Sequence, residues 1–316
     1  MLFLELKTTI MKHLSKSIFL LFSIIGLGSP AFSQQKTFVK DSIMLGYMKS
    51  GYSNTHFKPE GKTDKDSNRQ GKWKDYEVRK DYALVDIDNK PKQIRGYFLV
   101  YGEGKYVDNK KDGDWDFYVI EDISFKKILQ KHVHYQKGIR TDEFKYYFPN
   151  GKVAQIGKYE NNNIQGEVKA YYSNGSLYGL IHYKDNKKEG TDTYYYPNGV
   201  TKIQISFKGD SINGEYTSYY ENKTLQEKSY SNMGSPDSTY RYYYSNGQLW
   251  IEKKYNNGLL MNVTGSYDQQ GKPRDKGTLK DGTGTVNYYT EDGTLYNTQT
   301  YKDGKMISEA SNGTFR

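Results

Sequence analysis

The chain of 316 residues contains no cysteine, which excludes disulfides, thiolate metal ligands and cysteine nucleophiles. Proline occurs seven times and tryptophan three times. Mean hydropathy is −0.91, as low as that of many disordered chains, but disordered segments are poor in aromatic residues. Here 33 tyrosines and 31 glycines argue against disorder and also against a helical protein. The composition favours a wet, mostly β protein with aromatic faces over an enzyme with a deep apolar core.

Long hydrophobic runs are missing except near the start of the chain. From Met11 the sequence has two lysines, an apolar stretch over residues 18–27, and small residues before Gln34. This is the pattern of a secretory signal peptide cleaved near Ser33–Gln34, and the stretch is shorter than the roughly 20 residues of a membrane-spanning helix. We expect translation to start at Met11 and residues 1–33 to be removed. The mature protein is then exported, to the periplasm, the outer membrane or the exterior.

Turn-forming dipeptides recur through the chain with a nearly fixed step. Six of them lie 24 residues apart and a seventh follows after 22: Asn150-Gly151, Asn174-Gly175, Asn198-Gly199, Asn222-Lys223, Asn246-Gly247, Gln270-Gly271 and Asp292-Gly293. Such a period is typical of repeat architectures. Asn-Gly is also a strong hairpin signal, because both central residues of a type I′ turn need a positive φ. We therefore expect type I′ hairpins at these pairs.

A tyrosine stands three residues before every one of these turns. The seven are Tyr147, Tyr171, Tyr195, Tyr219, Tyr243, Tyr267 and Tyr289. The same spacing from a glycine to an aromatic residue and then a tyrosine extends upstream to Tyr76 and Tyr118. The seven tyrosines that precede the turns are the candidate binding residues of the chain.

Between the turns, apolar and polar residues alternate with the period of a β-strand. Each repeat of about 24 residues is therefore predicted to be a β-hairpin. The fold class is all-β, an elongated antiparallel meander of repeated hairpins with one apolar face and one polar face that carries the repeated tyrosines. We expect repeats over residues 66–316, irregular at 77–141, and an N-terminal cap or extension at 34–65. The apolar face must be covered by curling, by pairing or by a partner.

The repeat pattern of glycine, aromatic residue, Tyr-Tyr and Asn-Gly resembles the bacterial variant of the membrane occupation and recognition nexus (MORN) repeat. Residues 166–187 and 240–258 are the clearest copies. The resemblance implies a β-repeat binding scaffold, and many chains with such repeats are classed as YwqK-type antitoxins. The sequence departs from the pattern at Lys223, which replaces a turn glycine, and at 262–275, where the apolar alternation weakens.

The sequence shows little catalytic chemistry. His132 and His134 would share one face of a strand, the spacing of a two-ligand metal site, but no carboxylate is visibly placed to complete it. The acidic stretch 108–114 lacks the spacing of a calcium loop and fits an inter-hairpin turn. We expect no catalytic residue, no metal and no cofactor, and therefore a protein that is not an enzyme.

The repeated tyrosines admit two interpretations. In one, each phenol covers the backbone of neighbouring strands and stabilises the sheet by about 0.2–1 kcal/mol. In the other, they form a stacking platform for sugars or extended peptides. The sequence favours an exported, non-enzymatic scaffold that binds a protein or a cell-envelope component, with a glycan or anionic lipid headgroup also open as partners. Nucleic acid is disfavoured because export removes the protein from it. The alternatives are an antitoxin or immunity protein and, more weakly, a carbohydrate-binding module.

Overall fold

The computed structural model describes residues 59–87, 90–120 and 127–311. The expected signal peptide and most of the expected cap at 34–65 lie outside these residues. The described ranges are built from strands and turns, and they contain no helix of the length and apolarity that crossing a membrane requires. The chain divides into two compact units. The first runs to Leu177 and includes Tyr183–Lys187, and the second comprises Tyr178–His182 and the chain from Lys188 onward.

In the first unit, eight strands pair antiparallel in the order of the chain. They are β1 (Glu60–Thr63), β2 (Arg69–Ile87), β3 (Lys90–Val107), β4 (Lys110–Ile120), β5 (Lys127–Gln136), β6 (Ile139–Tyr147), β7 (Val153–Glu160) and β8 (Asn163–Tyr171). The short strand β1 pairs with β2, and Gly61 lies flat against the indole of Trp73, where no Cβ would fit. The residues that interrupt the repeat form one long β2–β3 hairpin, paired from Gly71–Tyr106 to Ile87–Lys90.

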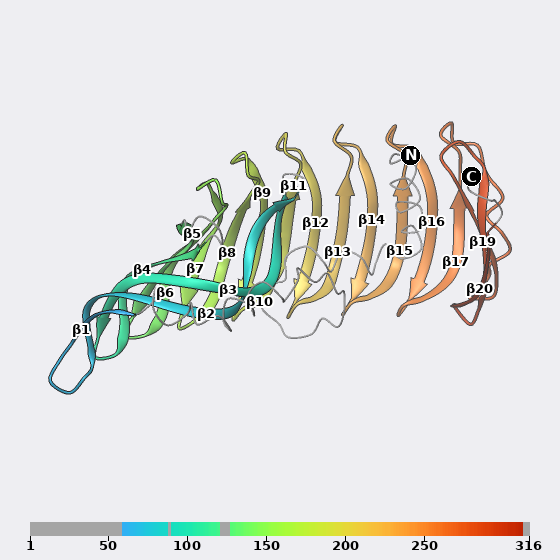
Figure 1. Cartoon of the computed structure of the whole chain (residues 1–316). Helices are drawn as coiled ribbons and strands as arrows, with labels where there is room; N and C mark the ends of the chain where they lie inside the picture. Colours follow the sequence, from blue (N-terminus) through green and yellow to red (C-terminus); the bar gives the residue numbers. More distant parts are fainter. Residues whose placement is uncertain (1–58, 88–89, 121–126, 312–316) are drawn as a thin grey trace. The chain divides into compact units, whose positions relative to one another are not determined.

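In the second unit, seven strands form an antiparallel meander, and Figure 1 shows them side by side in chain order. They are β11 (Gly190–Tyr195), β12 (Thr201–Lys208), β13 (Ser211–Tyr219), β14 (Leu225–Asn232), β15 (Ser235–Tyr243), β16 (Leu249–Asn256) and β17 (Leu259–Ser266). A separate three-stranded sheet follows, made of β18 (Gly284–Tyr289), β19 (Leu295–Lys302) and β20 (Lys305–Ser311). The residues of β9 (Leu177–Lys184) and β10 (Lys187–Lys188) are divided between the two units. These strands confirm the expected all-β meander of hairpins.

The Asn-Gly turns are not of the expected type. In the turn at Asn198-Gly199 only the glycine has a positive φ, 82°. The Gly199 N–H donates to the carbonyl of Tyr196 (2.9 Å), and the Tyr196 N–H donates to the carbonyl of Val200 (2.8 Å). This is a type I turn followed by one left-handed residue. The expectation of type I′ turns here is wrong, because asparagine acts through its side chain: Asn198 Oδ1 accepts the N–H of Val200 at 3.0 Å.

Type I′ turns occur instead at the opposite ends of the hairpins, between one repeat and the next. Asn161 and Asn162 have φ values of 49° and 70°, as this turn requires. Each such turn also bonds to the preceding repeat. The Asn162 N–H donates to the carbonyl of Arg140 (3.0 Å), while its Oδ1 accepts the N–H of Arg140 (2.8 Å). Asp210 makes the same reciprocal pair with Lys188 (3.0 and 2.8 Å), so the 24-residue step is fixed by hydrogen bonds.

Part of the apolar face of the second unit is covered by the chain itself. Tyr240, Ile251 and Val263 of the meander form one core cluster with Leu279 and Val286, and the half-buried Tyr288 packs against it. The three-stranded sheet therefore covers the C-terminal end of this face. The sequence departure at 262–275 lies where the chain crosses over: Gly271 still closes a turn on Asp268, but no strand follows it until Gly284.

Candidate binding surface

The repeated tyrosines occupy equivalent positions in their hairpins. Tyr195, Tyr219 and Tyr243 are the last residues of β11, β13 and β15, and all three side chains are half-buried. We call these three residues the tyrosine row. Tyr147 and Tyr171 end β6 and β8 of the first unit in the same way, Tyr289 ends β18, and Tyr267 follows β17; all four are half-buried.

The row lies on the polar face of the second unit. Along β13, the side chains that alternate with the buried Ile212 and Ser218 are those of Glu215, Thr217 and Tyr219. The ladder to β14 shifts by one residue between Ser218 and Tyr219. A bulge of this kind re-aims a side chain at the end of a strand. Tyr219 is therefore presented beside the Asn222-Lys223 turn rather than in the core.

A second tyrosine, directly after each member of the row, holds the repeats together. The phenol of Tyr196 donates to the main-chain carbonyl of Tyr219 at 2.9 Å. Tyr220 donates to the carbonyl of Tyr243 at 2.8 Å, and burial raises the pKa of both donating phenols. The sequence interpretation considered the row alone as the stabilising ladder, and it missed this neighbour. The sequence signal for this second tyrosine is the Tyr-Tyr doublet that precedes each turn of the row.

A groove lies between two successive turns at the row, Asn198-Gly199 and Asn222-Lys223. Its volume is about 460 Å³, and its lining includes Asn198, Thr201, Gln204, Tyr219 and Lys223. The groove thus combines one phenol with amide, hydroxyl and ammonium groups. This mixture of an aromatic wall and a few polar groups is typical of ligand sites.

Lys223 occupies a position that favours glycine. Its φ is 71°, and the turn keeps the bonds of its glycine-containing relatives, since the Lys223 N–H donates to the carbonyl of Tyr220 at 2.9 Å. A left-handed conformation costs a residue with a Cβ roughly 1–2 kcal/mol. Strain of this kind concentrates at functional positions. Lys223, at which the sequence departs from the repeat pattern, also places a cation in the groove.

Two ion pairs also lie on this face of the second unit. Lys228 lies 3.4 Å from Glu215, and Arg241 lies 2.6 Å from Glu252. No described acidic side chain comes within ion-pair distance of Lys223, which is exposed. Its ammonium group is the cation that lines the groove.

The opposite, apolar face of the second unit contains a titratable carboxyl group. Burial raises the pKa of Glu227 to about 7, although the charge of Lys253 and a hydrogen bond from Ser229 oppose the shift. Lys253 is 6% exposed, and its ammonium group donates to the phenol of Tyr288 at 3.1 Å. These groups are enclosed by tyrosines of the core and do not line the groove.

The histidine pair of the first unit has carboxylate neighbours that the sequence did not reveal. His132 Nδ1 lies 2.7 Å from Asp116 Oδ1, and His134 Nδ1 lies 2.7 Å from Asp114 Oδ1. Local spacing did not show these aspartates, because they lie on β4, which pairs with β5 and brings both of them opposite the histidines. Within the described ranges, however, no three such side chains are arranged to hold a metal ion.

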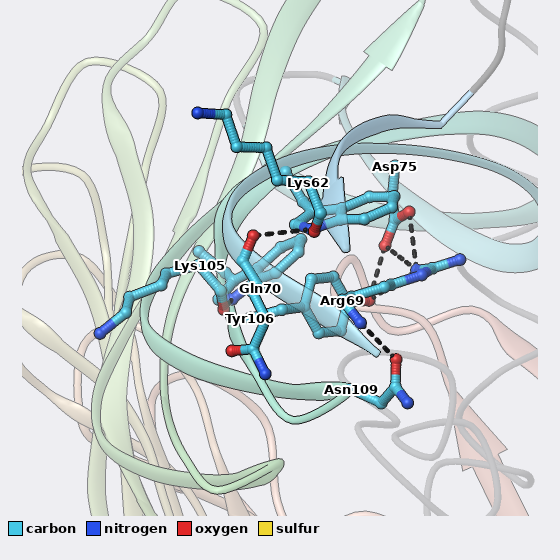
Figure 2. A network of polar contacts seen from close by, with 9 residues as sticks. Lys62, Arg69, Gln70, Asp75, Lys105, Tyr106 and Asn109 are labelled. Carbon is cyan, nitrogen blue, oxygen red and sulfur yellow. Dashed lines mark hydrogen bonds and ion pairs between the residues drawn. The ribbon is translucent and has the colours of Figure 1, made fainter. Parts of the chain in front are cut away.

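The polar network at the start of the first unit is structural. Figure 2 shows the Arg69 guanidinium against the Asp75 carboxylate, at 3.0 and 3.1 Å. The phenol of Tyr106 donates to the same carboxylate at 2.6 Å, and burial followed by this contact raises its pKa to about 12. The guanidinium also lies 4.7 Å from the ring centre of Trp73. Because each polar group has a partner in the network, it fastens β2 to β3 and presents no reactive group.

Comparison with protein families identifies the repeat that this chain resembles. The model described as the MORN repeat variant matches residues 143–161, 164–185, 188–208, 212–232 and 236–257. Five consecutive repeats match the MORN variant. Each matched segment spans a strand, an Asn turn and the next strand, and the tyrosine row lies within segments that match this repeat. Repeats of this type are non-enzymatic and commonly mediate binding or scaffolding.

Other comparisons add little. No curated protein matches the chain. Among solved structures, a pore of the Photorhabdus luminescens Tc holotoxin aligns with 80% of this chain at 10% identity and a TM-score of 0.19. The alignment spans 16% of the toxin chain, and a score this low supports no conclusion about fold or function.

Proposed function

We propose that the protein is an exported, non-enzymatic scaffold that binds a component of the cell envelope through the polar face of its repeats. The binding surface consists of the tyrosine row and the groove between its Asn turns. Export is proposed from the signal-like pattern before Gln34. Binding is proposed because one repeated surface carries aromatic and polar groups, and the groove at Tyr219 brings such groups together.

The placement of Tyr219 carries this proposal. Its main-chain carbonyl is bonded by the neighbouring repeat, while its side chain lines the groove together with Gln204 and Lys223. The phenol of Tyr196 thus holds the backbone of Tyr219, and the phenol of Tyr219 itself faces the groove. A pre-organised aromatic group of this kind binds with little loss of conformational freedom.

The proposal is tested by removing two phenols of the row. The double variant Tyr195→Ala/Tyr219→Ala is expected to keep the β signal in circular dichroism, because the bonds between repeats come from the phenols of Tyr196 and Tyr220. It is expected to lose cosedimentation with isolated cell envelopes. Tyr230→Ala is the matched control, since Tyr230 is 41% exposed on β14 and lies outside the row.

Two results would reject the proposal. One is cosedimentation of the double variant at the level of the unaltered protein. The other is an equal loss in the Tyr230→Ala control, which would show that any exposed tyrosine matters and that the row has no special role. If a specific protein toxin rather than the envelope is retained by the row, the antitoxin or immunity alternative replaces the envelope-binding function.

A further inference from the structure

The spacing of the tyrosine row suits a ligand with a regular repeat. Tyr195, Tyr219 and Tyr243 end β11, β13 and β15, which are separated by one intervening strand each. Because neighbouring strands lie about 4.7–4.9 Å apart, successive row residues are offset by about 10 Å across the sheet. In a β-1,4-linked glycan, consecutive sugars are flipped, and the disaccharide repeat has nearly the same length. Each phenol would then meet the same face of every second sugar ring.

We propose that the tyrosine row binds a β-1,4-linked polysaccharide that carries carboxylate groups and lies across the strands. This inference rests on the proposed function, since it names the ligand class of the same surface. The phenol is amphipathic: its ring packs on the C–H face of a sugar and its hydroxyl group stays in water. Asn198, Thr201 and Gln204 line the groove beside Tyr219 and supply amide and hydroxyl groups for the hydroxyls of the sugar.

Lys223 indicates that the ligand is negatively charged. It replaces the turn glycine at a φ of 71°, and it is the cation that lines the groove. A single ammonium group beside a tyrosine fits one carboxylate of a sugar acid.

The test uses two oligosaccharides with the same linkage, a hexamer of β-1,4-mannuronate and the neutral mannohexaose, titrated into the chain from Gln34 by calorimetry. The acidic hexamer is expected to bind about tenfold more tightly, the usual size of one charge-assisted hydrogen bond. Lys223→Gly is expected to remove this preference while its unfolding midpoint stays the same or rises. Tyr219→Ala should weaken binding of both hexamers, and Tyr230→Ala should change neither.

Several outcomes overturn the inference. Failure of the acidic hexamer to bind, or tighter binding to phosphatidylglycerol vesicles than to the hexamer, would each reject an acidic glycan. A preference that survives Lys223→Gly would reject the assignment of the charge recognition to Lys223. The two proposals can be separated. If the row remains necessary for cosedimentation with envelopes and the hexamers do not bind, the scaffold function stands and the ligand class is wrong. Loss of the row dependence itself would instead reject the function.

Discussion

Burial of the Glu227 carboxyl group is expected to make the free energy of unfolding fall as the pH rises. Its carboxyl group ionises at about 7 in the folded protein against 4.5 for an unperturbed side chain, because burial disfavours the charged form. Below pH 4.5 the carboxyl group is protonated in both the folded and the unfolded chain, so it does not lower the free energy of unfolding. As the pH rises, the unfolded chain loses the proton first, so folding stability falls until the folded carboxyl also ionises near pH 7. The contribution is therefore present at low pH and lost by pH 8.

The size of this effect follows from the shift. At 1.36 kcal/mol per pKa unit, a shift from 4.5 to about 7 corresponds to at most about 3 kcal/mol of unfolding free energy. The side chain is partly exposed, which makes this an upper bound. Glu227→Gln keeps the shape of the protonated acid and cannot ionise. The difference between the two proteins is expected to grow between pH 4 and pH 7 and to level off above pH 8.

The assay is urea unfolding followed by circular dichroism at pH 4, 5, 6, 7 and 8 for both proteins. Because all other titrating groups are shared, subtracting the two curves isolates the carboxyl group. Parallel curves across this range would refute the reasoning, since they would mean that Glu227 ionises at the same pH in the folded and unfolded chains.

Four further predictions follow. Lys223→Gly is expected to stabilise the protein by about 0.5–1 kcal/mol in urea unfolding, because the relief of left-handed strain exceeds the extra chain entropy of glycine; a loss of stability would contradict this. Tyr220→Phe should cost about 1 kcal/mol by the same assay, since it deletes one hydrogen bond between repeats, and an unchanged midpoint would mean the bond contributes nothing. Asp192 is fully buried against Lys188 at 2.9 Å, so Asp192→Ala should cost about 3 kcal/mol by leaving a poorly solvated ammonium group; a cost no larger than that of Tyr220→Phe would argue against a buried pair. Mass spectrometry of the protein from its native cell should find an N-terminus at or near Gln34, and a retained Met11 would reject export.

The alternation of residues was sufficient to predict the hairpins, because period-2 patterning and a fixed 24-residue step leave few other arrangements. Turn chemistry was predicted less well. Asn198-Gly199 and Asn161-Asn162 both contain asparagine, and the dipeptide alone does not tell whether its side chain or its backbone makes the turn. The reciprocal bonds of Asn162 with Arg140 depend on the neighbouring repeat, which a pairwise view of one hairpin does not include.

The candidate site was predicted in part. The position of Tyr219 beside a turn follows from its spacing, and the structure adds its groove. The structural role of Tyr220 was missed because one-residue offsets change the face of a strand, and only the ladder shift at Tyr219 shows which phenol turns outward. The aspartates beside His132 come from a different strand, and the strand register that brings them together is not written in local spacing.

The central claim is that a partner lies on the tyrosine row, and oxidative footprinting of tyrosines measures this directly. The protein would be labelled free and bound to isolated envelopes, and modification of each tyrosine would be quantified by mass spectrometry. Protection confined to Tyr195, Tyr219 and Tyr243, with Tyr230 modified equally in both states, is the predicted result. Equal modification of the row in both states, or protection of Tyr230 alone, would contradict the claim.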